Sequence, residues 1–187
     1  MRIIAGKHKG RKIETGKAAP HVRPTSGFAR EAIFNIVSHG VYAGAYRGKA
    51  VADLCCGSGA FGLEALSRGA GRVTFVDMDH HALLGTKANV ERMGEDAQAT
   101  FVRADVAQLP PAKAPFALLF LDPPYFSGLI PPCLNRLLAG GWMDKDSLLV
   151  VEHDEREQPV LPAAFFELDH RRYGRASVRL LKRGEDA

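Results

Sequence analysis

The sequence predicts an α/β protein with a doubly wound, mostly parallel seven-stranded sheet, an antiparallel C-terminal strand and a small N-terminal extension. Three observations support this fold class. From Lys49 onward, short apolar runs alternate with amphipathic segments of helical period, as expected when helices cover both faces of a parallel sheet. The last two runs are joined by a turn at Gly174 that is too short for a parallel crossover. The length of 187 residues suits one domain with an appendage.

The order of the elements follows from their hydrophobic periodicity. Residues 23–40 predict a helix that is capped by Thr25 or Ser26 and ended by Gly40. Its expected apolar stripe consists of Phe28, Ala32, Ile33, Ile36 and Val37. Strands are expected at 50–54, 72–77, 99–105, 116–122, 147–153, 165–173 and 177–183, and helices at 58–70, 80–93 and 128–141. Pro131 and Pro132 are expected to delay the start of the last helix.

Positive charge is concentrated in the first 47 residues. This part holds nine Lys or Arg and two Glu, a net charge of +7, which leaves −3 for residues 48–187. Its first segments, RIIAG and RKIET, flank the turn-rich KHKG and predict a β-hairpin. A basic front on a mildly acidic body suggests a polyanionic partner, although a solvated basic arm fits the charge equally well.

Several classes of protein do not fit the composition. No uncharged apolar run reaches about 18 residues, the length that would suggest a membrane span. The basic N-terminus lacks the apolar core of a signal peptide. No pair among Cys55, Cys56 and Cys133 has metal-site spacing, so we expect reduced thiols, a cytoplasmic location and no metal.

A glycine-rich loop follows the first strand of the alternating region. Gly57, Gly59 and Gly62 have the G-x-G-x-x-G spacing between a strand and a helix, which allows a nucleotide to approach the helix N-terminus. Asp77, twenty residues after Gly57, ends the next strand and could accept hydrogen bonds from ribose hydroxyls. On spacing alone, the loop suggests a nicotinamide dinucleotide.

Two further acids favour a different ligand. Asp53 lies just before the loop, where its charge would repel a pyrophosphate but tolerate a cation or zwitterion. Asp105 ends the third strand, where it could accept a hydrogen bond from an adenine amine. Acids at three successive strand ends therefore favour S-adenosylmethionine. The alternative is that they are helix caps and solvated strand ends.

The run LLFLDPPY, residues 118–125, carries the candidate chemistry. Asp122 follows a buried strand, Pro123 and Pro124 stiffen the turn, and Tyr125 offers a flat face for a base. A carboxylate and the Pro123 carbonyl could accept both N–H groups of an exocyclic base amine and so direct its lone pair toward a methyl group. The alternative is a proline-rich turn that merely ends a strand.

The chain resembles a known family along essentially its whole length. MRIIAGKHKGRKI, RPTSGFAREAIFNI, DLCCGSGAFGLEALSRGA, FVDMD and DPPY are typical of class I, Rossmann-like S-adenosylmethionine-dependent methyltransferases of the amino-methylating type. More narrowly, these motifs are similar to those of the RsmD family of bacterial 16S ribosomal RNA guanine-N2 methyltransferases. The N-terminal motifs are the specific ones, because many methyltransferases share the glycine loop and DPPY.

The resemblance implies roles for individual residues. It divides the chain into an RNA-contacting extension, residues 1–47, and a methyltransferase domain, residues 48–187. The implied catalytic residues are Asp122, Pro123, Pro124 and Tyr125. The implied cofactor-binding residues are Asp53, Cys55, Gly57, Gly59, Asp77, Met78, Asp105 and Val106. The implied substrate-binding residues are Lys7, Lys9, Arg11, Lys12, Arg23, Thr25 and Arg30. Cys55–Cys56, Gly27–Phe28 and Asp77 depart from the family pattern.

The expected function is methylation of the N2 amine of a guanine in 16S ribosomal RNA, with S-adenosylmethionine as the donor. We expect a flipped-out or loop nucleotide, because a paired amine is inaccessible. The substrate would be the RNA in a small ribosomal subunit or an assembly intermediate, and the enzyme a monomer without membrane contact. The alternatives are a DNA adenine or cytosine amino-methyltransferase, a glutamine-methylating enzyme, a nicotinamide-dependent oxidoreductase and a non-catalytic RNA-binding protein.

Overall fold

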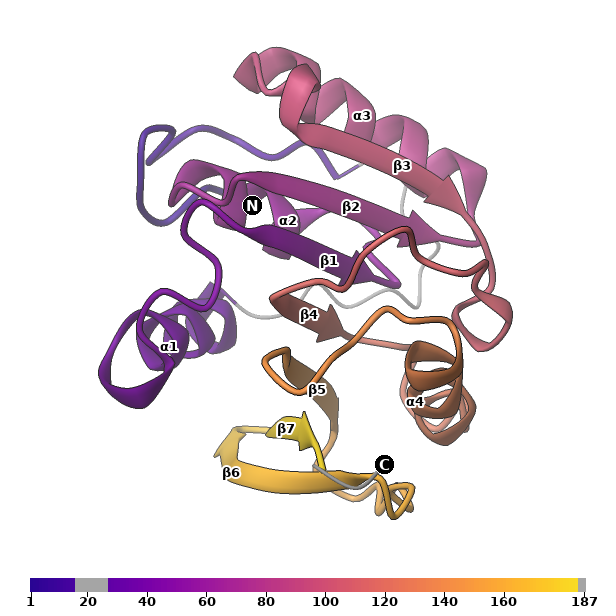
Figure 1. Cartoon of the computed structure of the whole chain (residues 1–187). Helices are drawn as coiled ribbons and strands as arrows, with labels where there is room; N and C mark the ends of the chain where they lie inside the picture. Colours follow the sequence, from indigo (N-terminus) through magenta and orange to yellow (C-terminus); the bar gives the residue numbers. More distant parts are fainter. Residues whose placement is uncertain (16–26, 185–187) are drawn as a thin grey trace.

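The computed structural model describes residues 1–15 and 27–184 (Figure 1). The helices are α1 (Gly27–Ser38), α2 (Ala60–Ser67), α3 (His80–Met93) and α4 (Ile130–Ala139), with 3-10 turns η1 (Gly40–Tyr42), η2 (Asp96–Gln98) and η3 (Val106–Gln108). The strands are β1 (Ala50–Leu54), β2 (Arg72–Asp77), β3 (Ala99–Arg103), β4 (Leu118–Leu121), β5 (Leu148–Asp154), β6 (Phe165–Tyr173) and β7 (Ala176–Arg183). Within the described part of the chain, every helix is too short or too polar to cross a membrane.

All seven strands form one sheet in the order β3-β2-β1-β4-β5-β7-β6. The five strands β3, β2, β1, β4 and β5 are parallel, and β7 runs antiparallel to both β5 and β6. The predicted doubly wound sheet with an antiparallel C-terminal strand is therefore confirmed. The strand order reverses between β1 and β4, and ligands of open α/β sheets bind at such a point, beyond the carboxyl ends of the strands.

Helices cover both faces of the sheet, so its strands are apolar on both sides. Alternate strand residues belong to two separate core clusters, with Val51 in one and its neighbour Ala52 in the other. The first cluster includes buried residues of α1, α2 and α3, and the second includes buried residues of α4. In the first cluster, the rings of Phe34, Phe61 and Phe120 stack in sequence, with centroids 4.7 and 4.1 Å apart.

Helix α1 buries a different face from the one predicted. Ile33 and Val37 are buried as expected, but Phe28 is 70% exposed. Ala32 and Ile36 are only partly buried, and Phe34 fills the interior instead. Apolar residues occupy so much of this helix that periodicity alone does not select one face, and the stacking of Phe34 on Phe61 decides the orientation. The predicted caps Thr25 and Ser26 lie outside the described residues.

The two prolines of α4 do not delay its start. The helix begins at Ile130, and Pro131 and Pro132 lie within its first turn. An N–H group in the first turn has no intrahelical acceptor, so proline loses nothing there, and its fixed φ suits the helix.

The N-terminal segment folds back on itself as predicted, but its pairing is minimal. Arg2 and Lys12 form a single antiparallel bridge. The N–H of Ile3 donates to the Arg11 carbonyl, and the N–H of Ile13 donates to the Met1 carbonyl. Ile3 and Ile13 are buried in the first core cluster, so this segment packs with the sheet domain.

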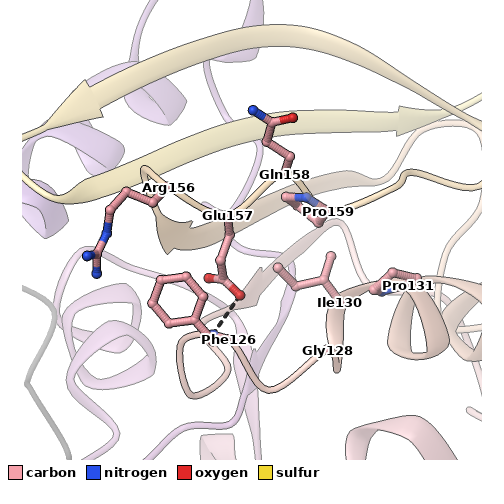
Figure 2. A pocket seen from close by; sticks show the side chains of 8 residues that line it. All are labelled: Phe126, Gly128, Ile130, Pro131, Arg156, Glu157, Gln158 and Pro159. Carbon is pink, nitrogen blue, oxygen red and sulfur yellow. Dashed lines mark hydrogen bonds between the residues drawn. The ribbon is translucent and has the colours of Figure 1, made fainter.

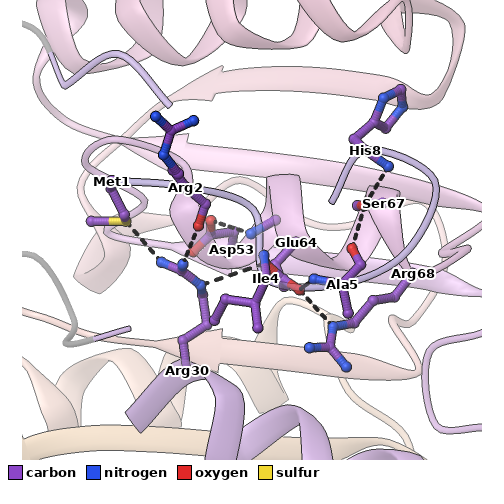
Figure 3. Close-up of polar contacts among 11 residues, drawn as sticks. Met1, Arg2, Ile4, Ala5, His8, Arg30, Asp53, Glu64, Ser67 and Arg68 are labelled. Carbon is purple, nitrogen blue, oxygen red and sulfur yellow. Dashed lines mark hydrogen bonds and ion pairs between the residues drawn. The ribbon is translucent and has the colours of Figure 1, made fainter. Parts of the chain in front are cut away.

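A buried carboxylate attaches the N-terminal segment to α2 (Figure 3). Glu64 is fully buried and accepts the N–H groups of Ile4 and Ala5, at 2.7 and 2.9 Å. It also accepts from Nε of Arg68 at 2.7 Å and lies 3.7 Å from Nε of Arg30. One side chain on α2 thereby joins α1 and the first residues of the chain to the helix that follows the glycine loop.

We predict that Glu64→Gln destabilises the protein by about 3–5 kcal/mol, because it leaves the buried Arg30 without its anionic partner. The measurement is urea unfolding of the two proteins. Glu91→Gln is the control, because Glu91 on α3 forms a half-exposed pair with Lys87 and its loss should cost no more than about 0.5 kcal/mol. Equal effects of the two substitutions would contradict the role of Glu64.

Candidate active site

Carboxyl groups gather at the edge of the sheet where the parallel strands end. Asp53 is the second-last residue of β1 and Asp77 is the last residue of β2. Asp122 follows β4, and Glu152 lies near the end of β5. The register pairs Leu54 with Val76 and with Leu121, so the strand ends are level and adjacent. This geometry brings together acids that are separated by up to about a hundred residues in the sequence.

The glycine loop requires its glycines. Gly57 and Gly59 have positive φ values of 51° and 72°, and Gly59 is the N-cap of α2. A Cβ atom on Gly59 would lie 2.4 Å from Cγ2 of Thr86, whereas the space around a Cβ on Gly57 is open. Thr86 of α3 also donates its hydroxyl to the Gly57 carbonyl at 3.0 Å. Thr86 thus supports the loop, a contact that the sequence pattern did not reveal.

Asp77 also stabilises the loop from β2. Its Oδ2 accepts the N–H of Gly57 at 2.8 Å, and its Oδ1 accepts the N–H of Asp79 at 2.9 Å. A carboxylate has about four acceptor positions, so these two bonds leave capacity for ribose hydroxyls. The side chain is partly exposed at the strand end. Its role toward a nucleotide stays a prediction.

Asp53 lies beneath the loop and not on an open surface. Its side chain is 2% exposed, and Oδ2 accepts the N–H of Gly62 at 2.9 Å. Burial raises the pKa of Asp53, and the nearby charges of Asp122 and Asp77 raise it further. In this position Asp53 fixes the start of α2. Direct contact between Asp53 and a ligand stays a prediction.

The remaining cofactor candidates differ in accessibility. Asp105 caps η3 through the N–H of Ala107 at 2.9 Å, which is the capping role weighed as the alternative. Val106 is buried in the second core cluster, so its side chain does not line the surface. Met78 is 66% exposed beside Asp77. Cys55 is partly buried with a positive φ of 57°, and burial raises the pKa of its thiol, which disfavours a nucleophilic role.

The turn after β4 is held against the neighbouring strands. The Asp122 N–H donates to the Leu54 carbonyl of β1 at 3.4 Å, next to the glycine loop. Pro123 is buried and Pro124 is exposed, so the two prolines fix the chain as it leaves the sheet. Tyr125 is partly buried, and its hydroxyl donates to Oε1 of Glu152 on β5 at 3.4 Å.

Glu152 is a site residue that sequence reasoning missed. It is 2% exposed, and its Oε2 has no hydrogen-bond partner within the described residues. Burial, followed by the charge of Asp122, raises the pKa of Glu152 to about 9. Glu152 is therefore protonated at neutral pH beside Asp122. The only signal in the sequence was an acid within the buried run LLVVEH.

Four of the expected substrate-binding residues lie on the surface of the N-terminal segment. Lys7, Lys9, Arg11 and Lys12 are exposed. Three of these four have partners within the protein: Lys7 pairs with Glu95 at 2.6 Å, Lys12 with Glu14 at 3.5 Å, and Arg11 donates to the Arg92 carbonyl.

The expectation that Arg30 binds substrate is wrong for this structure. Arg30 is 1% exposed, pairs with Glu64 and donates to the Met1 sulfur and the Arg2 carbonyl (Figure 3). An arginine in a basic segment is usually at the surface, but this one is neutralised in the interior. The other two expected substrate residues, Arg23 and Thr25, lie outside the described part of the chain.

The acids at the carboxyl edge fit one kind of cofactor. S-adenosylmethionine carries a sulfonium and an ammonium group, and clustered carboxyl groups stabilise positive charge. A pyrophosphate would be repelled by the same groups. The open space above Gly57 leaves room beside the loop. The carboxyl groups at this edge of the sheet therefore suit S-adenosylmethionine better than a dinucleotide.

The strand order and the glycine loop at the carboxyl edge define the Rossmann-like fold of methyltransferases. The chain belongs to the RsmD family, whose model, described as "Conserved hypothetical protein 95", matches residues 1–182. The ribosomal RNA small subunit methyltransferase D of Escherichia coli is 31% identical over 98% of this chain and 90% of that protein. YlbH of Bacillus subtilis is 34% identical over 98% of this chain and 99% of that protein. The structure of yhhF from Escherichia coli has a TM-score of 0.83 at 30% identity, covering 98% of this chain and 97% of that one.

We predict that Glu152→Gln raises the melting temperature at alkaline pH and has a smaller effect under acidic conditions. Above pH about 4.5 the unfolded Glu152 releases its proton, but the folded Glu152 keeps it until pH about 9. The unfolded state is thus increasingly favoured, and wild-type stability falls across this window. Glutamine does not titrate, so the variant avoids this loss.

Thermal unfolding of both proteins from pH about 4 to 9 measures the difference. Glu155→Gln is the matched control, because Glu155 is exposed in the same segment and its replacement should leave the pH dependence unchanged. A constant difference between wild type and Glu152→Gln at every pH would show that Glu152 is already ionised in the folded protein.

Proposed function

We propose that this protein transfers the methyl group of S-adenosylmethionine to the N2 amine of a guanine in small-subunit ribosomal RNA. The observation that carries the proposal is the rigid turn Asp122–Tyr125, which leaves β4 beside β1 and its glycine loop. The names of related proteins support the proposal, since the Escherichia coli relative of this chain is named a ribosomal RNA small subunit methyltransferase.

The turn has the groups needed to orient an amine. The exocyclic amine of guanine has two N–H groups, which would donate to the Asp122 carboxylate and the Pro123 carbonyl. Tyr125 would stack on the base. Both acceptors then hold the nitrogen lone pair toward the donor, and the carboxylate stabilises the positive charge that develops on the nitrogen. S-adenosylmethionine supplies the electrophilic methyl group when bound.

The arrangement of carboxyl groups makes Asp122 suitable for this role. Glu152 is protonated beside it, because burial and, after burial, the charge of Asp122 raise the Glu152 pKa to about 9. Asp53 has a raised pKa for related reasons, with burial as the largest cause. Asp53 and Glu152 are buried, whereas Asp122 and Asp77 are partly exposed, so Asp122 and Asp77 are the carboxyl groups that would face the amine and the cofactor.

We further propose that the extension at residues 1–47 contacts RNA and that residues 48–187 carry the reaction. Lys7, Lys9, Arg11 and Lys12 are exposed and would approach phosphates, whose contacts position RNA without reading its sequence. We also propose that the enzyme is a monomer that works in the cytoplasm on a small subunit or an assembly intermediate.

The test of the proposal is transfer of a labelled methyl group from S-adenosylmethionine to small ribosomal subunits, naked 16S RNA and DNA, followed by nucleoside analysis. We expect label in N2-methylguanosine from the small-subunit RNA. Label in methyladenosine, in DNA or in protein would overturn the proposed substrate.

We predict that Asp122→Ala lowers the methylation rate by roughly 10²- to 10³-fold or more, because it removes a positioned acceptor and its charge. Binding of S-adenosylhomocysteine, measured by calorimetry, should change little. Asp146→Ala is the control, since its side chain is 78% exposed and should leave both properties unchanged. Retained activity in Asp122→Ala would remove Asp122 from the mechanism.

A further inference from the structure

Phe126, the residue after Tyr125, has an unusual conformation and exposure. Its φ is +60°, and its side chain is 58% exposed. A left-handed conformation is disfavoured for a bulky aromatic residue, and such strain gathers at functional sites. Within the described residues, Cys55 of the glycine loop is the only other non-glycine residue with a positive φ. Phe126 and Cys55, the two residues with this backbone conformation, thus flank the proposed active site.

The segment after β5 holds the Phe126 backbone in place. The N–H of Phe126 donates to Oε1 of Glu157 at 2.6 Å (Figure 2). The other oxygen of this carboxylate accepts the N–H of Asp154 at 3.1 Å. Glu157 therefore ties the turn after β4 to the end of β5, and its charge is already engaged by two backbone donors.

A fixed cation lies over the Phe126 ring. The guanidinium carbon of Arg156 is 5.2 Å from the ring centroid, a distance typical of a cation–π contact. Arg156 binds the buried Asp154 with two guanidinium nitrogens, at 2.8 and 3.2 Å. Arg175 binds the same carboxylate at 2.7 Å, and these contacts hold the pKa of Asp154 well below its usual value. The ring is thus pre-positioned before any ligand arrives.

A pocket of about 390 Å³ lies beside this ring, which is within the range of small-molecule sites (Figure 2). Its lining residues are Phe126, Gly128, Ile130, Pro131, Arg156, Glu157, Gln158 and Pro159. It combines an aromatic face, aliphatic walls and one guanidinium. Proteins that bind single-stranded RNA use the same combination, because every base has a flat face that stacks on an aromatic ring.

We propose that Phe126 and Arg156 form a stacking site for the nucleotide adjacent to the target guanine. When a base leaves its stack to enter an active site, its neighbour loses a stacking partner. An exposed ring one residue from Tyr125 can replace that partner, and Arg156 can meet the phosphate between the two nucleotides. This inference rests on the proposed function and adds a second nucleotide subsite to it.

The test compares Phe126→Ala, Phe126→Leu and Phe126→Trp with the wild type. Phe126→Ala should raise the KM for the ribosomal substrate roughly 5- to 100-fold, the loss expected for one stacked base. Its kcat and its affinity for S-adenosylhomocysteine should change little. Phe126→Trp should retain the wild-type KM, whereas Phe126→Leu, which is apolar but not flat, should behave like Phe126→Ala.

Phe166→Ala is the matched control. Phe166 is also an exposed phenylalanine, but it lies on β6 and pairs with Lys182 of β7. The neighbouring Leu181 pairs with Leu149 near the start of β5, so Phe166 lies at the end of the strands opposite to the proposed active site. It should leave the KM unchanged. A wild-type KM in Phe126→Ala, or equal KM values for the Leu and Trp variants, would overturn the stacking site.

A second measurement separates this inference from the proposed function. Fluorescence anisotropy of a labelled short oligoadenylate gives its affinity for each variant without any methylation. Weaker binding by Phe126→Ala and Phe126→Leu, but not by Phe126→Trp or Phe166→Ala, supports the stacking site even if the wild type methylates no guanine. Equal oligoadenylate affinity in all variants overturns the stacking site even if the wild type methylates guanine as proposed.

Discussion

Electrostatic crowding at one edge of the sheet is the constraint on which the rest of the site depends. Parallel strands end side by side, and in this protein they bring Asp53, Asp77, Asp122 and Glu152 to the same edge. The fold limits the repulsion in two ways. Backbone N–H groups of the glycine loop and of α2 bind Asp53 and Asp77, and burial keeps Glu152 protonated.

The same arrangement links stability to the proposed chemistry. A glycine loop that donates N–H groups to these acids can form only if α2 and α3 are correctly placed. Thr86 fixes the loop from α3, and Glu64 secures α2 to the first residues of the chain. The N-terminal segment therefore contributes to the geometry of the site even where it does not touch a substrate.

Much of the fold could be predicted from the sequence, because local signals agree with the tertiary structure. The apolar runs, the glycine spacing and the turn at Gly174 each have a direct physical meaning, and β1, β2, α3 and β6 have the predicted bounds. Long-range pairing could not be predicted. Arg30 looked like a surface cation because its partner Glu64 lies 34 positions away. Glu152 became visible only through the register that pairs Leu121 with Val151.

The most direct test of this account is calorimetric titration of the protein with S-adenosylmethionine and, separately, with NAD. The clustered carboxyl groups predict saturable binding of one S-adenosylmethionine per chain and no binding of NAD, whose pyrophosphate would meet the same negative charge. Binding of NAD with none of S-adenosylmethionine would contradict the assignment of this edge to a cationic cofactor.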